Sequence, residues 1–183
     1  MTGLLATALL LATSGAGAPP ASPPPPAPLS CPRGTTAAGA PPPAGMAEWC
    51  EAPDPSGRPR RQGPAREWYG EGAIHVESTW RDGQLDGPWA EYHRDGRKAA
   101  EGRYRAGEKN GPWRYWYESG QLEEEVTFEM GRRHGRFVQW WPGGARRTEG
   151  TFCHALQCGR WTTWNDAGDE LGTIVYEEIR NRP

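Results

Sequence analysis

Glycines and aromatic residues recur along the C-terminal two-thirds of the chain with a strict period of 24 residues. We number positions within a unit by the count of residues after its opening glycine, which is therefore position zero. The opening glycines are Gly63, Gly87, Gly111, Gly135 and Gly159. Aromatic side chains lie at positions two, five and seventeen of nearly every unit, with Ala65 as the exception at position two. Such a fixed period is typical of a protein built from one stacked supersecondary unit.

Each unit carries glycines where a chain would turn. One lies at position nine of every unit, and another lies at position twenty of the first three units, as Gly83, Gly107 and Gly131, with Ala155 in its place in the fourth. Two turns in 24 residues leave two segments of about six to eight residues, the length of strands. We therefore predict five β-hairpins stacked edge to edge, a ribbon of ten strands about 45–50 Å long.

Composition divides the chain at residue 63 and excludes several classes of protein. Fourteen of the 19 prolines precede it and 18 of the 19 aromatic residues follow it. Hydrophobic residues make up 36% and there are 25 glycines, too little apolar material for a helical bundle or a doubly wound sheet. The net charge of residues 63–183 is −3, from 17 Lys and Arg against 20 Asp and Glu, which lacks the basic field of a nucleic-acid-binding protein.

The first residues predict export. A short apolar run from Leu4 to Ala12 is followed by small residues, and Ser14-Gly15-Ala16 offers a small-x-small cleavage site. We expect a signal peptide over residues 1–18, a proline- and alanine-rich linker with a flap over residues 19–62, and the repeats over residues 63–183. The mature protein is expected in the periplasm or outside the cell.

Four cysteines in an exported chain predict two disulfides. Three pairings are formally open; the interpretation we favour joins Cys31 to Cys50 around the flap and Cys153 to Cys158 around one tight turn, which stabilises the fold by about 2 kcal/mol. The alternative is a metal site built on Cys153-His154 and Cys158. The chain has no second cysteine or histidine pair at zinc spacing nearby, so we expect no metal.

The repeated stretch GPWAEYHRDGRKAAEGRYRAGEKNGPWRYWYESG resembles the variant MORN-repeat family, whose units run G-x-W-x-x-W/Y-Y-x-x-G…E-x-x-Y-x-x-G-x-x-x-G. The resemblance covers five units, at 63–86, 87–110, 111–134, 135–158 and 159–183. It implies an elongated single-layer sheet of stacked hairpins that acts as a scaffold for proteins or lipid surfaces rather than as a catalyst. Some bacterial members of the family carry the label YwqK-like antitoxin.

Two sets of side chains are candidates for binding. The densest aromatic patch could present a platform, although aromatic residues can equally form the core of the ribbon. Its members are Trp113, Tyr115, Trp116, Tyr117, Trp140 and Trp141. Glutamates at position fourteen should stack into an acidic column, or else form an exposed solubilising face. They are Glu77, Glu101, Glu125 and Glu149.

Together these patterns predict an all-β, elongated single-layer sheet of about five stacked hairpins after a disordered proline-rich N-terminal segment. No nucleophile or phosphate-loop sequence occurs, so we expect neither an enzyme nor a cofactor. The expected function is binding of a protein partner through an aromatic or an acidic face. Three alternatives stay open: binding of cell-wall glycan, binding of a membrane surface, which the net charge disfavours for anionic lipid, and neutralisation of a toxin.

Overall fold

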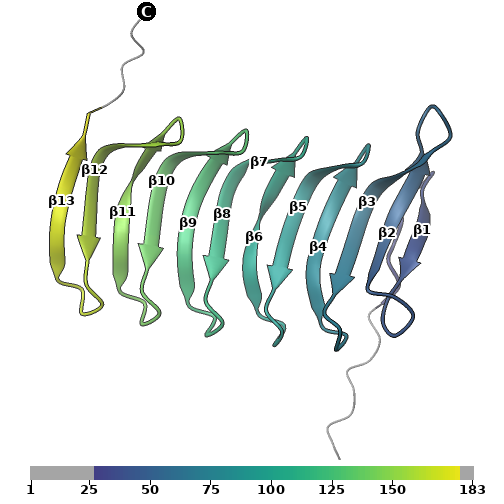
Figure 1. Ribbon diagram of the computed structural model, residues 1–183, viewed down its shortest axis with the longest axis horizontal. Helices are drawn as coiled ribbons and strands as arrows, with labels where there is room; N and C mark the ends of the chain where they lie inside the picture. The colour runs from purple at the N-terminus through teal and green to yellow at the C-terminus, as the bar shows by residue number, and fades with distance from the viewer. Residues whose placement is uncertain (1–26, 178–183) are drawn as a thin grey trace, which may run out of the picture.

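The computed structural model describes residues 27–177, which form one open antiparallel sheet and contain no helix (Figure 1). The expected signal peptide and the start of the linker lie outside this range. The thirteen strands are β1 (Thr36–Ala40), β2 (Ala47–Pro53), β3 (Pro59–Trp68), β4 (Ile74–Arg81), β5 (Gln84–Tyr92), β6 (Lys98–Arg105), β7 (Glu108–Lys109), β8 (Gly111–Trp116), β9 (Leu122–Glu129), β10 (Arg132–Trp140), β11 (Arg146–Cys153), β12 (Leu156–Trp164) and β13 (Glu170–Tyr176).

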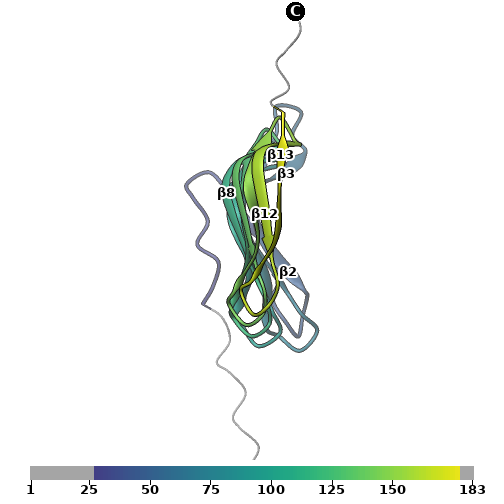
Figure 2. The same ribbon diagram turned by 90° about the vertical axis from the view of Figure 1, so that its left-hand side faces the viewer.

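The order of strands across the sheet is their order along the chain, and the two-residue β7 pairs only with β6. Seen from the side, the sheet is a single thin layer (Figure 2). The predicted all-β, single-layer ribbon of stacked hairpins is therefore confirmed. Its five predicted hairpins are β3–β4, β5–β6, β8–β9, β10–β11 and β12–β13.

The glycines lie in the turns, as predicted. At position twenty, two-residue loops such as Asp82-Gly83 join consecutive hairpins, and both residues have positive φ, 51° and 79°. Tight hairpin turns of this kind need positive φ at both central residues. In the fourth unit His154 and Ala155 adopt the same conformation, with φ of 52° and 73°, although neither is glycine.

The sheet begins earlier than the sequence pattern indicated. Residues 36–62, expected as part of a linker and flap, contain β1, β2 and the start of β3. Strand β2 pairs with β3 and places Trp49 opposite Ala65. Gly39 falls on the period, 24 residues before Gly63, but Glu48 and Pro59 stand where the repeat has its turn glycines, so these strands could not be found from the period.

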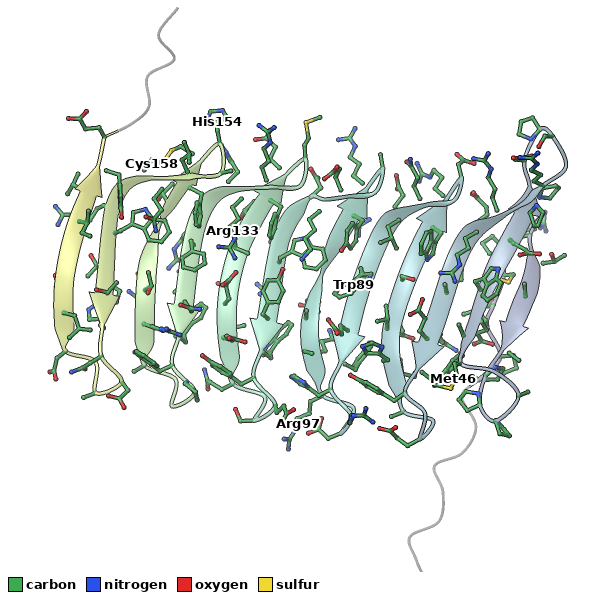
Figure 3. The ribbon with its side chains drawn as sticks, in the orientation of Figure 1. Met46, Trp89, Arg97, Arg133, His154 and Cys158 are labelled. Carbon is green, nitrogen blue, oxygen red and sulfur yellow. A yellow bond between two sulfur atoms is a disulfide. The ribbon has the colours of Figure 1, made fainter. Side chains whose placement is uncertain are left out.

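Side chains at positions two, fifteen and seventeen form a packed band on one side of the sheet, which we call the aromatic face (Figure 3). The rings of Tyr104 and Phe128 meet the Trp113 indole edge to face, at centroid distances of 5.2 Å and 6.1 Å. Trp113 is fully buried among its neighbours. The opposite side carries charged side chains, and we call it the charged face.

Candidate functional site

Basic side chains cover the aromatic face at position 22. The ammonium of Lys109 lies 4.0 Å from the ring centroid of Trp113, and its Nζ donates a 2.8 Å hydrogen bond to the Tyr115 hydroxyl. Arg133 lies over Phe137 at 5.6 Å and over Phe152 at 5.5 Å. These cation–π contacts cover the rings with charge, so the aromatic face is not an open apolar platform.

Burial shifts the protonation of groups on this face. Burial lowers the pKa of Lys109, with the charge of Arg133 acting in the same direction. Burial raises the pKa of Tyr115 to about 12, and the Glu124 carboxylate adds to the effect. Burial also raises the pKa of Glu124, opposed by Arg133 at 3.2 Å. The face is thus internally paired rather than poised for proton transfer.

The six aromatic residues predicted as one patch do not lie together on one surface. Trp113 is fully buried, so it belongs to the core and cannot contact a partner in the folded state. Tyr115 packs beside it at a centroid distance of 6.1 Å. Trp116 and Trp140 come directly after a shift in strand register, and Tyr117 and Trp141 begin the turns that follow.

Side chains at position six link each unit to the next. The register shift just before position five leaves the backbone there irregular, and the carbonyl of position five in the following unit accepts a hydrogen bond from position six. We call these four bonds the inter-unit ladder. They run from Tyr69 Oη to Tyr92 O (2.8 Å), His93 Nε2 to Trp116 O (3.0 Å), Tyr117 Oη to Trp140 O (2.8 Å) and Trp141 Nε1 to Trp164 O (3.0 Å).

The ladder explains two features of the sequence. Tyr117 and Trp141, predicted as binding residues, have their polar atoms engaged between units. The fifth unit carries Asn165 at position six, which instead bonds to Asp169 within its own turn. Polar aromatic residues and a histidine recurring at position six are the signal that could have revealed the ladder.

The predicted acidic column lies on the charged face, but every glutamate in it is paired. Glu77 lies 3.1 Å from Arg66 and accepts a hydrogen bond from the Tyr92 hydroxyl. The pairs of the other three are Glu101 with Lys98 (2.6 Å) and Arg114 (3.7 Å), Glu125 with Arg114 (2.7 Å), and Glu149 with Arg136 (3.0 Å) and Arg146 (2.8 Å). Sequence reasoning missed the arginines at position three, Arg66 and Arg114, although their 48-residue spacing matches two units.

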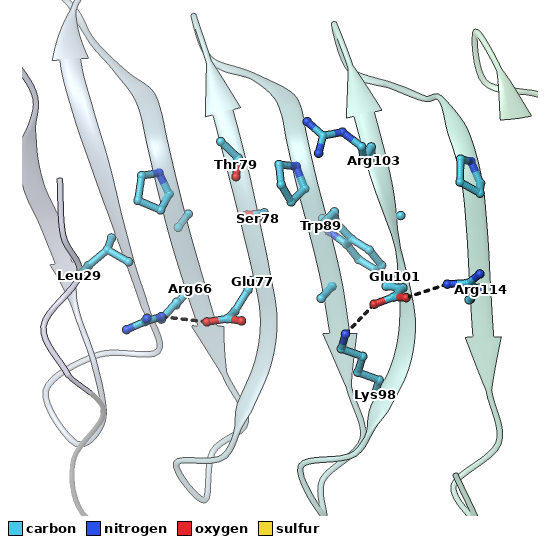
Figure 4. A pocket seen from close by; sticks show the side chains of 16 residues that line it. Leu29, Arg66, Glu77, Ser78, Thr79, Trp89, Lys98, Glu101, Arg103 and Arg114 are labelled. Atoms are coloured by element: carbon cyan, nitrogen blue, oxygen red, sulfur yellow. Dashed lines mark hydrogen bonds and ion pairs between the residues drawn. The ribbon is translucent and has the colours of Figure 1, made fainter. Parts of the chain in front are cut away.

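A groove of about 540 Å³ hollows the charged face over β3 to β8 (Figure 4). Position three holds Ala90 in the second unit, between Arg66 and Arg114 in its neighbours, and this small side chain leaves the hollow. Prolines at position one form an apolar ridge along it. The groove also contains Glu77, Glu101, Lys98, Arg103 and Leu29, and the ridge is Pro64, Pro88 and Pro112.

Both predicted disulfides are confirmed. Cys31 and Cys50 have Cα atoms 5.5 Å apart, and Cys153 and Cys158 have Cα atoms 5.7 Å apart. Among residues 27–177 no cluster of three or more His, Cys, Asp or Glu side chains could hold a metal ion. That same range has no helix of the length and hydropathy needed to cross a membrane.

Comparison with known proteins agrees with the repeat geometry. No curated protein matches the chain. The family model of the MORN repeat variant matches residues 109–130, which run from the end of β7 through the β8–β9 hairpin. The same glycine turns recur in all five hairpins. Residues 109–130 therefore match the variant MORN repeat, in agreement with the sequence resemblance.

Proposed function

We propose that the protein is an exported, non-catalytic repeat scaffold that binds a protein partner on its charged face, in the groove around Ala90. The observation that supports this proposal is the break in the charged face at Ala90, flanked by Arg66 and Arg114. The break exposes an apolar ridge next to charges of both signs, a combination suited to a polypeptide.

The ion pairs of the groove are weak enough for a partner's charged side chain to replace one of their members. The side chains of Arg114 and Lys98 are about half exposed, and such surface pairs each contribute about 0–1 kcal/mol. Replacing one of them by a pair across an interface therefore costs little. The proline ridge supplies contact area whose conformation is already fixed, which lowers the entropy cost of binding.

Export and the absence of catalysis are parts of the same proposal. Two disulfides are compatible with an oxidising compartment, as is the apolar leader sequence. MORN repeats are generally non-catalytic. The glutamates and arginines that could do acid–base chemistry are engaged with one another on a surface open to water.

Site-specific crosslinking tests the proposal. A photoreactive amino acid replaces Ala90 in the full-length protein, and the matched control carries it at Thr162, position three of the fifth unit and outside the groove. After irradiation in intact cells, we expect a discrete crosslinked protein from the Ala90 variant and none from the control. Equal crosslinking at both sites, or retention of the protein by purified cell-wall sacculi without any crosslinked protein, would contradict the groove.

A further inference from the structure

The last strand of the sheet differs from the interior strands at the positions where a sheet edge is normally protected. Natural proteins place charges on edge strands to prevent pairing with other chains. Here the interior strands carry glutamate at position fourteen, whereas β13, at the edge in Figure 1, carries Thr173 there. From Leu171 to Tyr176 the edge strand has no charged residue.

The side chains of β13 are apolar and exposed. Leu171 and Val175 are each 67% exposed and Ile174 is 60% exposed. Valine and isoleucine are also residues that favour strands. The opposite edge, β1, contains only threonine, alanine and glycine and runs into Pro41, so it lacks comparable side chains. The two ends of the ribbon are therefore chemically different.

A groove of about 400 Å³ adjoins this edge on the aromatic face. A Cβ atom on Gly172 would have no other atom within 4 Å, so the space beside this residue is open. Trp161, Leu171, Ile174 and Tyr176 also line the groove. In strand addition, main-chain hydrogen bonds supply affinity and pockets for alternate side chains supply specificity. Strand β13 offers both elements.

Acidic residues lie at both ends of the strand. Asp169 and Glu170 precede its apolar part and Glu177 follows it, and within residues 27–177 no basic side chain forms an ion pair with any of the three. Antiparallel pairing of β13 with a second copy would bring acid against acid at both ends, which is destabilising for directly opposed charges. The edge thus disfavours self-association and favours a partner with basic ends.

We propose that β13 is a docking edge for an extended segment of another protein, with a short β-branched centre flanked by basic residues. The segment adds an antiparallel strand to the sheet, and one of its apolar side chains enters the groove beside Gly172. This inference concerns a surface separate from the groove at Ala90 and stands or fails independently of it.

Peptide titration tests the docking edge. The probe is the peptide Ac-RKVTVTVKR-NH2, and its control, Ac-EDVTVTVDE-NH2, keeps the centre and reverses the ends. We expect the basic peptide to bind at least fivefold more tightly at 50 mM salt and the difference to shrink at 500 mM, because exposed charges are screened. Hydrogen exchange of the bound protein should slow at alternate amides of β13.

One protein variant and one modified peptide test the charge preference and the strand pairing separately. In Glu170→Lys/Glu177→Lys the preference should reverse toward the acidic peptide, and a basic peptide with N-methylated valines should not bind, since it cannot form the strand hydrogen bonds. Equal binding of both peptides, or protection confined to other strands, would overturn the proposal. Sedimentation as a dimer with β13 already protected would overturn it as well, by assigning the edge to a second copy.

Discussion

Side chains of the aromatic face are matched in size across neighbouring strands. A Cβ atom on Gly150 would lie 2.2 Å from the indole of Trp161, and one on Gly102 would lie 2.3 Å from that of Trp113. Where position two is the smaller Phe137, the residue opposite it is Val126. Position fifteen therefore holds glycine or serine where position two of the following unit is tryptophan, and valine where it is phenylalanine.

This matching predicts a specific coupling between two substitutions. Gly150→Val alone should destabilise the protein by about 1–3 kcal/mol, because the new side chain overlaps the Trp161 ring. Trp161→Phe alone should also destabilise it. The double variant recreates the Val126–Phe137 pair and should lose less than the sum, as measured by urea unfolding in a double-mutant cycle. Additive losses would show that the two side chains do not constrain each other.

Tyrosine protonation gives the stability a defined alkaline limit. The pKa of Tyr92 rises to about 12, first through burial and then through its hydrogen bond to Glu77, from an ordinary value of 10.0. The folded state therefore holds this proton more tightly, and the stability it supplies below pH 10 is lost as the pH rises from 10 to 12. The lowered pKa of Lys109 acts in the opposite direction, raising stability as the pH approaches 10.5 from below.

We expect the urea midpoint to fall between pH 10 and 12, and to fall less steeply in Tyr92→Phe. His75→Gln serves as a control, because it removes neither a tyrosine hydroxyl nor a lysine. Parallel curves for wild type and Tyr92→Phe would assign the alkaline loss to other groups.

At the scale of elements, the hairpins and their turns were predictable but the links between hairpins were not. Glycine spacing fixed the turns because positive φ is costly for other residues. Polar rings recur at position six, but the inter-unit ladder also depends on the register shifts before position five, which the spacing does not show. The sequence also did not show that Trp113 belongs to the core and Trp141 to the ladder, since both are tryptophans in a dense aromatic stretch.

The ladder predicts that Tyr117 contributes to stability through its hydroxyl. Tyr117→Phe keeps the ring but leaves the carbonyl of Trp140 without its partner, at a cost of about 1 kcal/mol. The matched control is Tyr176→Phe, whose hydroxyl makes no hydrogen bond to the described residues. In urea unfolding, Tyr117→Phe should have a lower midpoint than Tyr176→Phe. Equal midpoints would show that the ladder bond of Tyr117 does not contribute to stability.

The turn at Ala155 is the one place where an alanine occupies the position-twenty glycine site, with φ of 73°. Ala155→Gly should raise stability by about 1 kcal/mol, because glycine adopts this conformation without steric cost. The reverse control is Gly107→Ala, with φ of 84° and open space around its Cβ, which should lose a similar amount. Calorimetry with the disulfides intact measures the stability of both variants. No gain in Ala155→Gly together with no loss in Gly107→Ala would contradict the conformational argument.

At the scale of the whole molecule, the strands that pack closely are neighbours in the sheet. Stability in such a ribbon is a sum of hairpin terms and nearest-neighbour terms, so losses should spread only from the altered unit. This arrangement follows directly from the 24-residue period. The two N-terminal strands and the unprotected β13 edge do not, because both lie where the repeat gives way to other sequence.

Trp113→Ala in the third unit should cost about 3–5 kcal/mol and reduce hydrogen-exchange protection on both sides of β8. Trp161→Ala, one strand from the edge, should cost less and reduce protection mainly in β11 to β13. Hydrogen exchange followed by mass spectrometry resolves the two patterns. Uniform loss of protection in both variants would indicate one cooperative core instead of a chain of neighbours.

Each bond of the inter-unit ladder ends 23 residues further along, on the next bulge. An in-frame duplication of any internal unit would therefore supply its own donor and acceptor, while an insertion of any other length would misalign the bond that spans it. Duplication or deletion of whole units can thus lengthen or shorten this protein without breaking the ladder. The distance between the Ala90 groove and the β13 edge is then set by the number of units between them.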